Sequence, residues 1–383
     1  GTFQMYKEGQ SICEYMARRY GEDVFERILH NWWRAETFAE VFEVTTGEPL
    51  QTLDESWQYD LKKRILPIIE DADPPSQMAA ALTSSGFNLK PSVAKTASVA
   101  TADSQRVLYF SNTQGYTQIV RQSAGGGEVE VVVEGERSAE FESLHAFDSG
   151  LAVSGDGEVL AFAAKRNGRD HLVTWDLSRQ KERRRFSFPS IVAITSPAWS
   201  PDNGMLVFSG AAQSGITDLY TVDVRTGELV PLTADLYDDG DPTWHPDSDR
   251  IVFSSDRWQG GRQGLYNLFQ YELSSGRITQ LTRGNHNDVQ PQWAPDGSAV
   301  AFSSDRDGIY NLHLLSLDGN AGGRTAHVER IGSTLTGSFD PTWLLDKSGL
   351  LFTGFEAGRF NIYRMALDLA GSEETATGAD TEL

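Results

Sequence analysis

The sequence predicts a mainly β protein, a six-bladed β-propeller of four-stranded antiparallel blades, with a small N-terminal α-helical domain. Three observations predict this fold. A Pro-x-Trp motif recurs about every 50 residues, with its tryptophan at Trp199, Trp244, Trp293 and Trp343, and a period of that size with strand-like segments is typical of propellers. A short apolar strand that ends in Phe recurs with a similar period. The first 70 residues have helical periodicity instead.

The apolar strand defines the repeats. It occurs six times, and its last residues are Phe110, Phe162, Phe208, Phe253, Phe302 and Phe352. A third strand and, after a Gly-containing turn, a fourth strand follow in most repeats, which gives the four antiparallel strands of a blade. The Pro-x-Trp motif is missing from the first two repeats, where residues 100–103 and 152–156 stand in its place. We expect each motif tryptophan to lie between neighbouring blades, because one blade cannot cover both of its own faces.

Residues 1–70 are predicted to form a small antiparallel bundle of four amphipathic helices. The first apolar stripe stops at Gly21 and the third stops near Gly47, as helices commonly do at glycine. Thr52 and Glu55 have the spacing of a capping box at the start of the last helix. Pro67 is predicted to end that helix, because proline lacks the backbone N–H.

The remaining boundaries follow from composition. Residues 71–90 are predicted to form a linker, because Pro74 and Pro75 cannot continue a helix. The propeller is predicted over residues 91–369, but its sixth repeat ends after the third strand. We hypothesise that residues 86–92 supply the missing fourth strand and close the ring. Residues 370–383 are acidic with few apolar side chains and are predicted to be a disordered acidic tail.

Composition argues against several classes of protein. The chain has 33 basic and 54 acidic side chains and a net charge of −21, which is unfavourable for a nucleic-acid-binding surface. No run of about 18 apolar residues predicts a membrane span. The single cysteine, Cys13, is expected in the helical core. The one basic run, residues 181–185, is predicted to be a solvated edge strand. The chain begins at Gly1 without Met, so we expect a fragment or a processed product.

Acidic residues gather in the loops expected at one end of the propeller, where the fourth-to-first and second-to-third strand connections emerge together. Such a mouth can bind a cationic peptide, a protein partner or Ca²⁺ through carboxylates. The alternative is structural: the Asp before Pro caps its own turn, and the pairs Asp256-Arg257 and Asp305-Arg306 connect neighbouring blades. The candidate partner- or cation-binding residues are Asp238, Asp239, Asp241, Asn285, His286, Asp288 and Asp340, with Asp235 beside them.

The repeats resemble the TolB-like propeller family. The resemblance rests on x-Pro-x-Trp-Ser-Pro-Asp, on Ser-Ser-Asp-Arg at residues 254–257 and 303–306, and on Tyr-Asn-Leu at residues 266–268 and 310–312. It covers all six repeats. It implies a scaffold that binds a protein or peptide in the bacterial cell envelope, in the periplasm or outside the cell.

The helical segment resembles the C-terminal half of a gluzincin-type metallopeptidase domain, the peptidase MA family, at residues 6–11, 20–23, 37–40 and 53–57. In that family an upstream H-E-x-x-H helix and a further Glu hold zinc, and a tyrosine matched by Tyr6 can stabilise an oxyanion. No H-E-x-x-H occurs in this chain. We therefore expect Tyr6 to be structural here, and zinc only in a longer protein.

Three functions are compatible with these observations. The leading hypothesis is a non-catalytic TolB-like scaffold that binds a protein or peptide partner without a cofactor. The second is the non-catalytic C-terminal portion of a secreted zinc metallopeptidase whose propeller recruits or gates substrate. The third is a propeller hydrolase with its site in the channel, around Asp239, Asp241 and His286. No G-x-S-x-G nucleophile elbow is present, so a serine-peptidase domain of that type is not part of this sequence.

Overall fold

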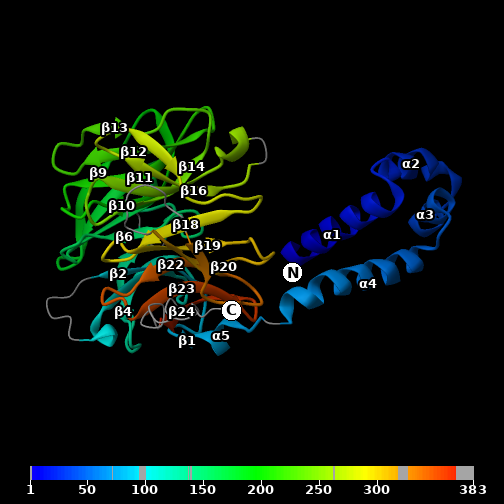
Figure 1. The fold of residues 1–383 in the computed structure, drawn as a ribbon, viewed down its shortest axis with the longest axis horizontal. Helices are drawn as coiled ribbons and strands as arrows, with labels where there is room; N and C mark the ends of the chain where they lie inside the picture. Colours follow the sequence, from blue (N-terminus) through cyan, green and yellow to red (C-terminus); the bar gives the residue numbers. More distant parts are fainter. Residues whose placement is uncertain are drawn as a thin grey trace, which may run out of the picture. The chain divides into compact units, whose positions relative to one another are not determined.

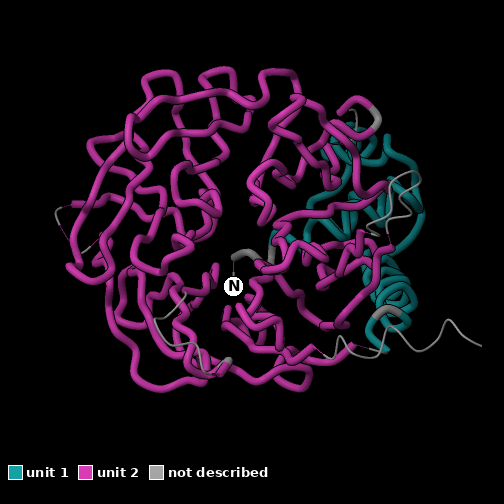
Figure 2. Tube along the Cα trace, turned by 60° about the vertical axis from the view of Figure 1, so that its left-hand side comes forward, with its two compact units in different colours: residues 1–71 teal, residues 72–383 magenta. Residues whose placement is uncertain are grey.

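The computed structural model describes residues 2–70, 72–94, 101–136, 138, 140–261, 264–317 and 327–367. The chain divides into two compact units, residues 1–71 and residues 72–383 (Figure 2). The predicted acidic tail lies outside the described residues. None of the described helices has the length and the hydropathy that crossing a bilayer requires.

The first unit is helical (Figure 1). Tyr15, Met16 and Phe42 are among the buried side chains of its core. Gly21, with φ 94°, follows the first helix, and Gly47, with φ 80°, follows the third, so both predicted stops are confirmed. The elements are α1 (Thr2–Tyr20), α2 (Val24–Asn31), the 3₁₀ turn η1 (Trp32–Arg34), α3 (Phe38–Thr46) and α4 (Leu50–Ile69).

Three local predictions about this unit are wrong. Helix α4 begins at Leu50 and has no side-chain cap, whereas the capping box forms in α3, between Thr37 and Glu40. Helix α4 also continues through Pro67, because a proline in the last turn removes only one helical hydrogen bond. Cys13 is exposed, because the buried stripe of α1 follows Tyr15 and Met16.

The second unit contains six four-stranded antiparallel sheets, which confirms the predicted six-bladed propeller. Blades 1 to 6 are numbered in the order of their first strands along the chain. Blade 1 contains β2 (Asn88–Ala94), β3 (Arg106–Ser111), β4 (Gln118–Ser123) and β5 (Glu130–Glu134); blade 2 contains β6 (Leu151–Val153), β7 (Val159–Arg166), β8 (Arg169–Asp176) and β9 (Lys181–Phe186); blade 3 contains β10 (Ile191–Trp199), β11 (Met205–Ala212), β12 (Thr217–Asp223) and β13 (Leu229–Pro231).

The other three blades follow the same plan. Blade 4 contains β14 (Asp239–Trp244), β15 (Arg250–Ser255), β16 (Asn267–Glu272) and β17 (Arg277–Gln280); blade 5 contains β18 (Asp288–Trp293), β19 (Ala299–Ser304), β20 (Asn311–Ser316) and β21 (His327–Arg330); blade 6 contains β22 (Ser338–Trp343), β23 (Gly349–Glu356), β24 (Arg359–Ala366) and β1 (Ala80–Ala81). The basic run 181–185 lies in β9, the outer strand of blade 2, as predicted.

The recurring tryptophans connect neighbouring blades. Trp199 Nε1 donates to Ala152 O at 3.2 Å, and Trp244 Nε1 donates to Ala198 O at 3.2 Å. Trp343 Nε1 likewise donates to Gln292 O at 3.1 Å. Each bond runs from the first strand of one blade to the first strand of the blade before it, so the predicted position between blades is confirmed for these three tryptophans.

The ring is closed by a segment other than the predicted one. The fourth strand of blade 6 is β1, in which Ala80 pairs with Arg364 and Ala81 pairs with Tyr363. The hypothesis that residues 86–92 supply this strand is wrong, since most of that segment lies in β2, the innermost strand of blade 1. The short helix α5 (Pro75–Met78) precedes β1, so the predicted linker contains α5, β1 and the start of β2, all of them parts of the propeller unit.

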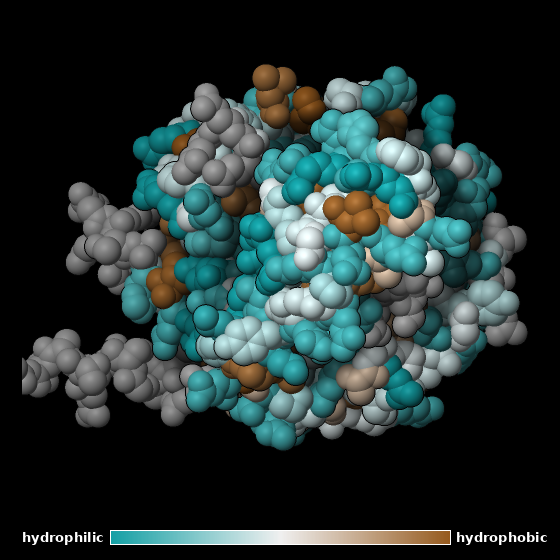
Figure 3. Space-filling view, turned by 90° about the vertical axis from the view of Figure 1, so that its right-hand side faces the viewer, coloured by the Kyte–Doolittle hydropathy of each residue, from teal (hydrophilic) through white to brown (hydrophobic). Residues whose placement is uncertain are grey.

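Hydrophilic residues predominate on the face drawn in Figure 3, and the hydrophobic ones form small separate patches. This distribution agrees with the net charge of −21. The apolar side chains lie chiefly between blades, where Phe208, Phe253, Phe302 and Phe352 are fully buried.

Candidate functional site

The blades are arranged in a ring (Figure 2), and the first strands of all six line a central channel with a cavity of about 290 Å³. In blade 4, Gly240 pairs with Ser254 and Thr243 pairs with Val252. Two residues, Asp241 and Pro242, therefore lie opposite a single residue of β15, which is a β-bulge. The first strands of blades 1, 3, 5 and 6 have the same irregularity at their x-Pro segments. The recurring proline thus marks a bulge that faces the channel.

The residue before each of these prolines has a left-handed backbone. The φ values are 57° for Lys90, 49° for Ser196, 51° for Asp241, 56° for Gln290 and 53° for Asp340. Residues other than glycine rarely adopt this conformation, because it strains the backbone. The conformation repeats from blade to blade while the side chain changes. The bulge is therefore a structural feature of the blade, and the changing side chains give the channel its chemistry.

These five residues form a hydrogen-bonded belt around the channel, which we call the channel belt. Ser196 Oγ donates to Asp241 Oδ1 at 2.8 Å, and Gln290 N donates to Asp241 Oδ2 at 3.3 Å. Asp340 N donates to Gln290 Oε1 at 2.9 Å. Lys90 Nζ lies 2.7 Å from Asp340 Oδ1. The belt connects blades 3, 4, 5, 6 and 1 in succession.

The channel belt contains two carboxylates and one ammonium group. The side chains of Lys90 and Asp340 are 13% and 10% exposed. Burial by itself lowers the pKa of Lys90, but Asp340, Asp241 and Asp148 raise it above its ordinary value. Lys90 is therefore protonated at neutral pH. Its single positive charge does not balance these three carboxylates, so this part of the channel is net negative.

The predicted loop residues Asp239 and Asp288 are fully buried in ion pairs. Both carboxylate oxygens of Asp239 accept from Arg257 Nη2 at 2.7 Å, and Asp288 Oδ1 accepts from Arg306 Nη2 at 2.8 Å. Each pair connects the first strand of a blade to the residues that follow its second strand. Arg306 thus turns back to its own blade, whereas Arg257 also pairs at 3.2 Å with Asp235, in the loop between blades 3 and 4. The interpretation that the Asp-Arg motifs connect neighbouring blades therefore does not hold for the pair of Arg306 with Asp288.

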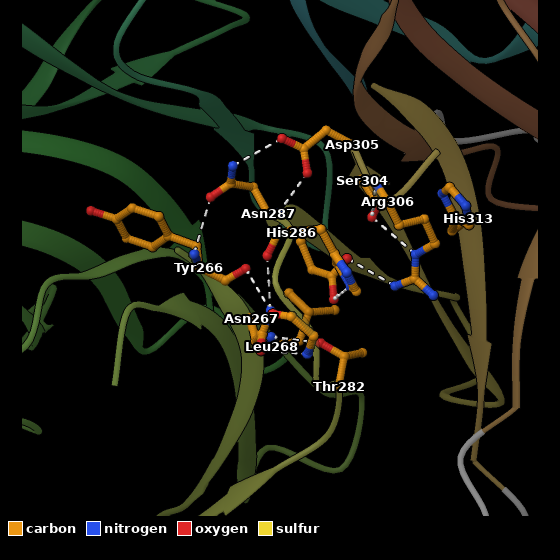
Figure 4. A network of polar contacts seen from close by, with 12 residues as sticks. Tyr266, Asn267, Leu268, Thr282, His286, Asn287, Ser304, Asp305, Arg306 and His313 are labelled. Atoms are coloured by element: carbon orange, nitrogen blue, oxygen red, sulfur yellow. Dashed lines mark hydrogen bonds and ion pairs between the residues drawn. The ribbon is translucent and has the colours of Figure 1, made fainter. Parts of the chain in front are cut away.

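Figure 4 shows the polar network that holds the loop before β18. Asn287 Nδ2 donates to Asp305 Oδ2 at 2.9 Å, and Tyr266 N donates to Asn287 Oδ1 at 3.1 Å. Asn267 Nδ2 donates to His286 O at 3.1 Å. His286 Nε2 lies 3.4 Å from Asp288 Oδ2. This loop is therefore fixed by its own hydrogen bonds, which favours a structural duty for its inner side chains.

One acidic group has the geometry of a metal site. A carboxylate oxygen from each of Asp218, Asp235 and Asp239 lies within 4.8 Å of the other two, and among the described residues no other such group is found. Burial raises the pKa of Asp218 above its ordinary value. Arg257 already donates to Asp235 and Asp239, so a cation here would compete with a guanidinium. Binding of Ca²⁺ stays a prediction.

The predicted face does not form one continuous cluster. Asp241 and Asp340 lie in the channel, whereas Asp238 is half-buried and accepts from Thr217 N at 2.8 Å. Asn285 is exposed. Tyr6 is 70% exposed on helix α1 of the other unit.

Sequence reasoning missed Lys90, Ser196 and Gln290 as channel residues. The signal that could have found them is the residue before each recurring proline. In blade 1 this signal was hidden, because Val93 stands at the position that tryptophan occupies in blades 3 to 6.

Three aromatic side chains lie together where blades 1, 2 and 6 meet, and of these Phe147 is exposed whereas Phe87 and Phe360 are half-buried. The ring of Phe147, which is 58% exposed, lies 5.1 Å from the ring of Phe87 and 6.3 Å from that of Phe360. We call these three residues the aromatic cluster. The next residue, Asp148, is exposed, and its charge acts on Lys90 of the channel belt. The aromatic cluster does not line the channel cavity, but Phe87 precedes Lys90 of the channel belt by three residues.

Residues 148–268 match the family model described as the TolB beta propeller domain. The propeller thus has a TolB-like fold. The matched segment runs from the start of blade 2 into the third strand of blade 4. This TolB-like propeller is similar to the crystal structure of TolB from Acinetobacter baumannii, with 17% identity and a TM-score of 0.52. The match covers 68% of this chain and 63% of that one, so the chain spans less than two thirds of that TolB.

A second solved structure shows the same likeness. The oligogalacturonate lyase from Vibrio parahaemolyticus is 14% identical and has a TM-score of 0.51, over 76% of this chain and 93% of that chain. At these identities the two likenesses show the fold, and the function of the TolB-like propeller must be argued from its own residues.

Proposed function

We propose that the chain is a non-catalytic scaffold that binds a basic, partly apolar segment of a protein or peptide partner in the bacterial cell envelope. The observation that carries the proposal is the aromatic cluster. Phe147 is 58% exposed and packs against Phe87 and Phe360. Clustered aromatic side chains at a folded surface are typical of the energetic centre of a protein interface.

The charge around the aromatic cluster indicates the kind of partner. Asp148 is adjacent to Phe147 in the chain, and Asp241 and Asp340 line the channel. The whole chain carries a net charge of −21. A positively charged segment would be attracted by this field, while its apolar side chains would pack on the aromatic rings. The TolB-like fold supports a scaffold, because a propeller presents the connections of several blades at one end.

Two fluorescent peptides of equal length test the proposal, one alternating Lys and Leu and the other alternating Glu and Leu. We expect the Lys-Leu peptide to raise its fluorescence anisotropy on binding and the Glu-Leu peptide not to bind. Phe147→Ala is expected to weaken binding about tenfold or more, as for an interface hot spot. Val230→Ala is the control, because Val230 is also exposed and apolar but lies on the outer strand β13.

Equal binding of the two peptides would contradict the charge argument. An unchanged affinity of Phe147→Ala with an unchanged melting curve would contradict the position of the site. Turnover of a peptide substrate, or stoichiometric zinc in the purified chain, would favour the metallopeptidase hypothesis over a non-catalytic scaffold. Recovery of the native protein in the cytoplasmic fraction of its host would contradict the envelope location.

A further inference from the structure

A second pocket, which shares Trp199 with the wall of the central channel, lies between blades 2 and 3. Its cavity has a volume of about 430 Å³, within the range of about 300 to 1,000 Å³ that is usual for small-molecule sites. We call it the interblade pocket. Its walls come from the outer strand β9, from the β12–β13 turn and from Trp199. Asp156 is the one acidic residue among its lining residues.

A bulge in β9 turns two adjacent arginines to this pocket. Thr174 pairs with Arg184 and Trp175 pairs with Glu182, so Arg183 is the extra residue of the bulge. Successive side chains of a regular strand point to opposite faces, and a bulge changes that alternation locally. Both Arg183 and Arg184 line the interblade pocket. The site is therefore shaped by a local irregularity of the backbone.

The positive charge of the interblade pocket is only partly compensated. Arg184 donates to Val224 O and Arg225 O, both at 2.6 Å, and its guanidinium lies 4.8 Å from the ring centre of Phe186. These bonds fix the side chain but supply no negative charge. Arg183 and Arg225 also line the pocket, and within the described part of the chain neither forms an ion pair. Three arginines and one acidic residue thus line the pocket, and the charge of Arg225 also acts on Asp223, which is not among the lining residues.

That carboxylate is itself engaged. Asp156 accepts from Ser154 Oγ and, at 3.0 Å, from Glu158 N. Burial raises its pKa, but these hydrogen bonds and the charge of Arg183 lower it below the ordinary value. Asp156 is therefore ionised at neutral pH, and the pocket keeps a net positive charge in a chain whose net charge is −21.

The arginines do not belong to the repeated plan of the blades. The outer strand of blade 3 is Leu229–Pro231, with the sequence Leu-Val-Pro, and that of blade 4 is Arg277–Gln280, with one arginine. A structural duty shared by all blades would place similar residues at equivalent positions. The arginine pair of β9 is specific to blade 2, which favours a local binding function.

We infer that the interblade pocket binds a small organic anion, a phosphate or carboxylate that carries an apolar group. Arg183 and Arg225 would hold the anionic head, since guanidinium groups bind such oxygens through paired hydrogen bonds. Trp199 and Val224 offer the apolar wall, and the Trp199 ring is fixed by its bond to Ala152 O at 3.2 Å. This site does not depend on the partner-binding proposal.

Calorimetric titration of the full chain with phenyl phosphate, benzoate and inorganic phosphate tests the inference. We expect phenyl phosphate or benzoate to bind more tightly than inorganic phosphate. The affinities of phenyl phosphate and benzoate, compared with each other, show which anionic head the pocket prefers. The double variant Arg183→Ala, Arg225→Ala is expected to lose about tenfold in affinity per arginine. Arg277→Ala is the matched control, because Arg277 lies on the outer strand of blade 4.

Tryptophan fluorescence is a second measurement of ligand binding, and it does not depend on whether the double variant folds. The indole of Trp199 lines the pocket, so ligand binding should change the tryptophan fluorescence, and Trp199→Phe should remove most of that change while retaining binding. Absence of binding by both phenyl phosphate and benzoate would overturn the inference. Equal affinity of the double variant and the original chain would overturn it as well.

Discussion

Lys90 Nζ of blade 1 lies 2.7 Å from Asp340 Oδ1 of blade 6. This ion pair crosses the junction at which the ring closes. The same junction is closed at the outer edge of blade 6 by Ala80 and Ala81, which pair with β24. An ion pair at the channel and a short strand at the periphery therefore hold together the two ends of the propeller.

Removing one partner of the channel ion pair should destabilise the propeller. We expect Lys90→Met or Asp340→Leu alone to lower the free energy of unfolding by about 3 kcal/mol, because each leaves a charge largely buried without its partner. The double variant should lose less free energy of unfolding than the two single variants lose together. Urea denaturation of the four proteins measures this coupling, and strictly additive losses would contradict it.

The pH dependence of this coupling follows from the pKa of Lys90, which is raised in the folded chain. A group whose pKa is raised by folding contributes its full stabilisation below its ordinary pKa, which is about 10.4 for lysine. This stabilisation is lost as the pH rises through the pKa of the folded chain. The coupling between Lys90 and Asp340 should therefore be constant from about pH 6 to about pH 9 and should decrease above about pH 10. A decrease of the coupling energy that begins near neutral pH would mean that a group other than Lys90 is responsible for it.

Two truncations test the closing strand. Removal of residues 1–71 takes away the helical unit and leaves β1 in place, so the melting temperature of the propeller should change little. Removal of residues 1–84 also deletes α5 and β1 and exposes the edge of β24. We expect it to lower the melting temperature by roughly 5 to 10 °C, at about 2 to 4 °C per kcal/mol. Equal melting temperatures for the two truncations would contradict this account.

Asp239 and Asp235 both pair with Arg257 but differ in exposure. Asp239 is fully buried and Asp235 is 37% exposed. We expect Asp239→Asn to destabilise the chain by about 3 kcal/mol, because it leaves the Arg257 charge poorly compensated. Asp235→Asn should have an effect of about 1 kcal/mol or less, as for exposed ion pairs. Chemical denaturation compares them, and equal effects would argue against a role for burial.

His313 should make the stability of the chain depend on pH near neutrality. It is buried, Nδ1 lies 3.1 Å from Asn311 O, and Nε2 has no hydrogen-bond partner among the described residues. Burial lowers the pKa of His313 below its ordinary value of 6.5. The unfolded chain therefore binds a proton that the folded chain does not, and stability falls as the pH decreases through about 6.5. The loss between about pH 7.5 and about pH 5.5 should be smaller in His313→Gln.

The sequence predicted the repeating parts of the propeller well. It predicted poorly the parts that occur only once. The apolar strands and the Trp positions were found because each is repeated and each depends on local burial. The closing strand β1 was missed, because Ala80 and Ala81 have no strand pattern of their own. They become a strand only because β24 offers an unpaired edge.

The candidate site divides in the same way. The residues before the recurring prolines can be found in the sequence. Their strained backbone and their position in the channel become apparent only in the structure, where Asp241 and Pro242 form a bulge opposite a single residue of β15. Asp239 and Asp288 looked accessible because they follow polar loops, whereas the fold buries both against arginines.

The sequence alone determined the number of blades, the order of strands within a blade and the acidic character of the chain, since these depend on period, polarity pattern and composition. Only the tertiary structure decided that Lys90 meets Asp340, that Phe147 lies on Phe87 and Phe360, and that Arg183 and Arg225 share one pocket. The physical reason is that a strand forms through its local pattern and its nearest neighbours. A contact between residues far apart in the chain exists only when neighbouring blades pack at a fixed angle, and for Lys90 with Asp340 only when the ring closes.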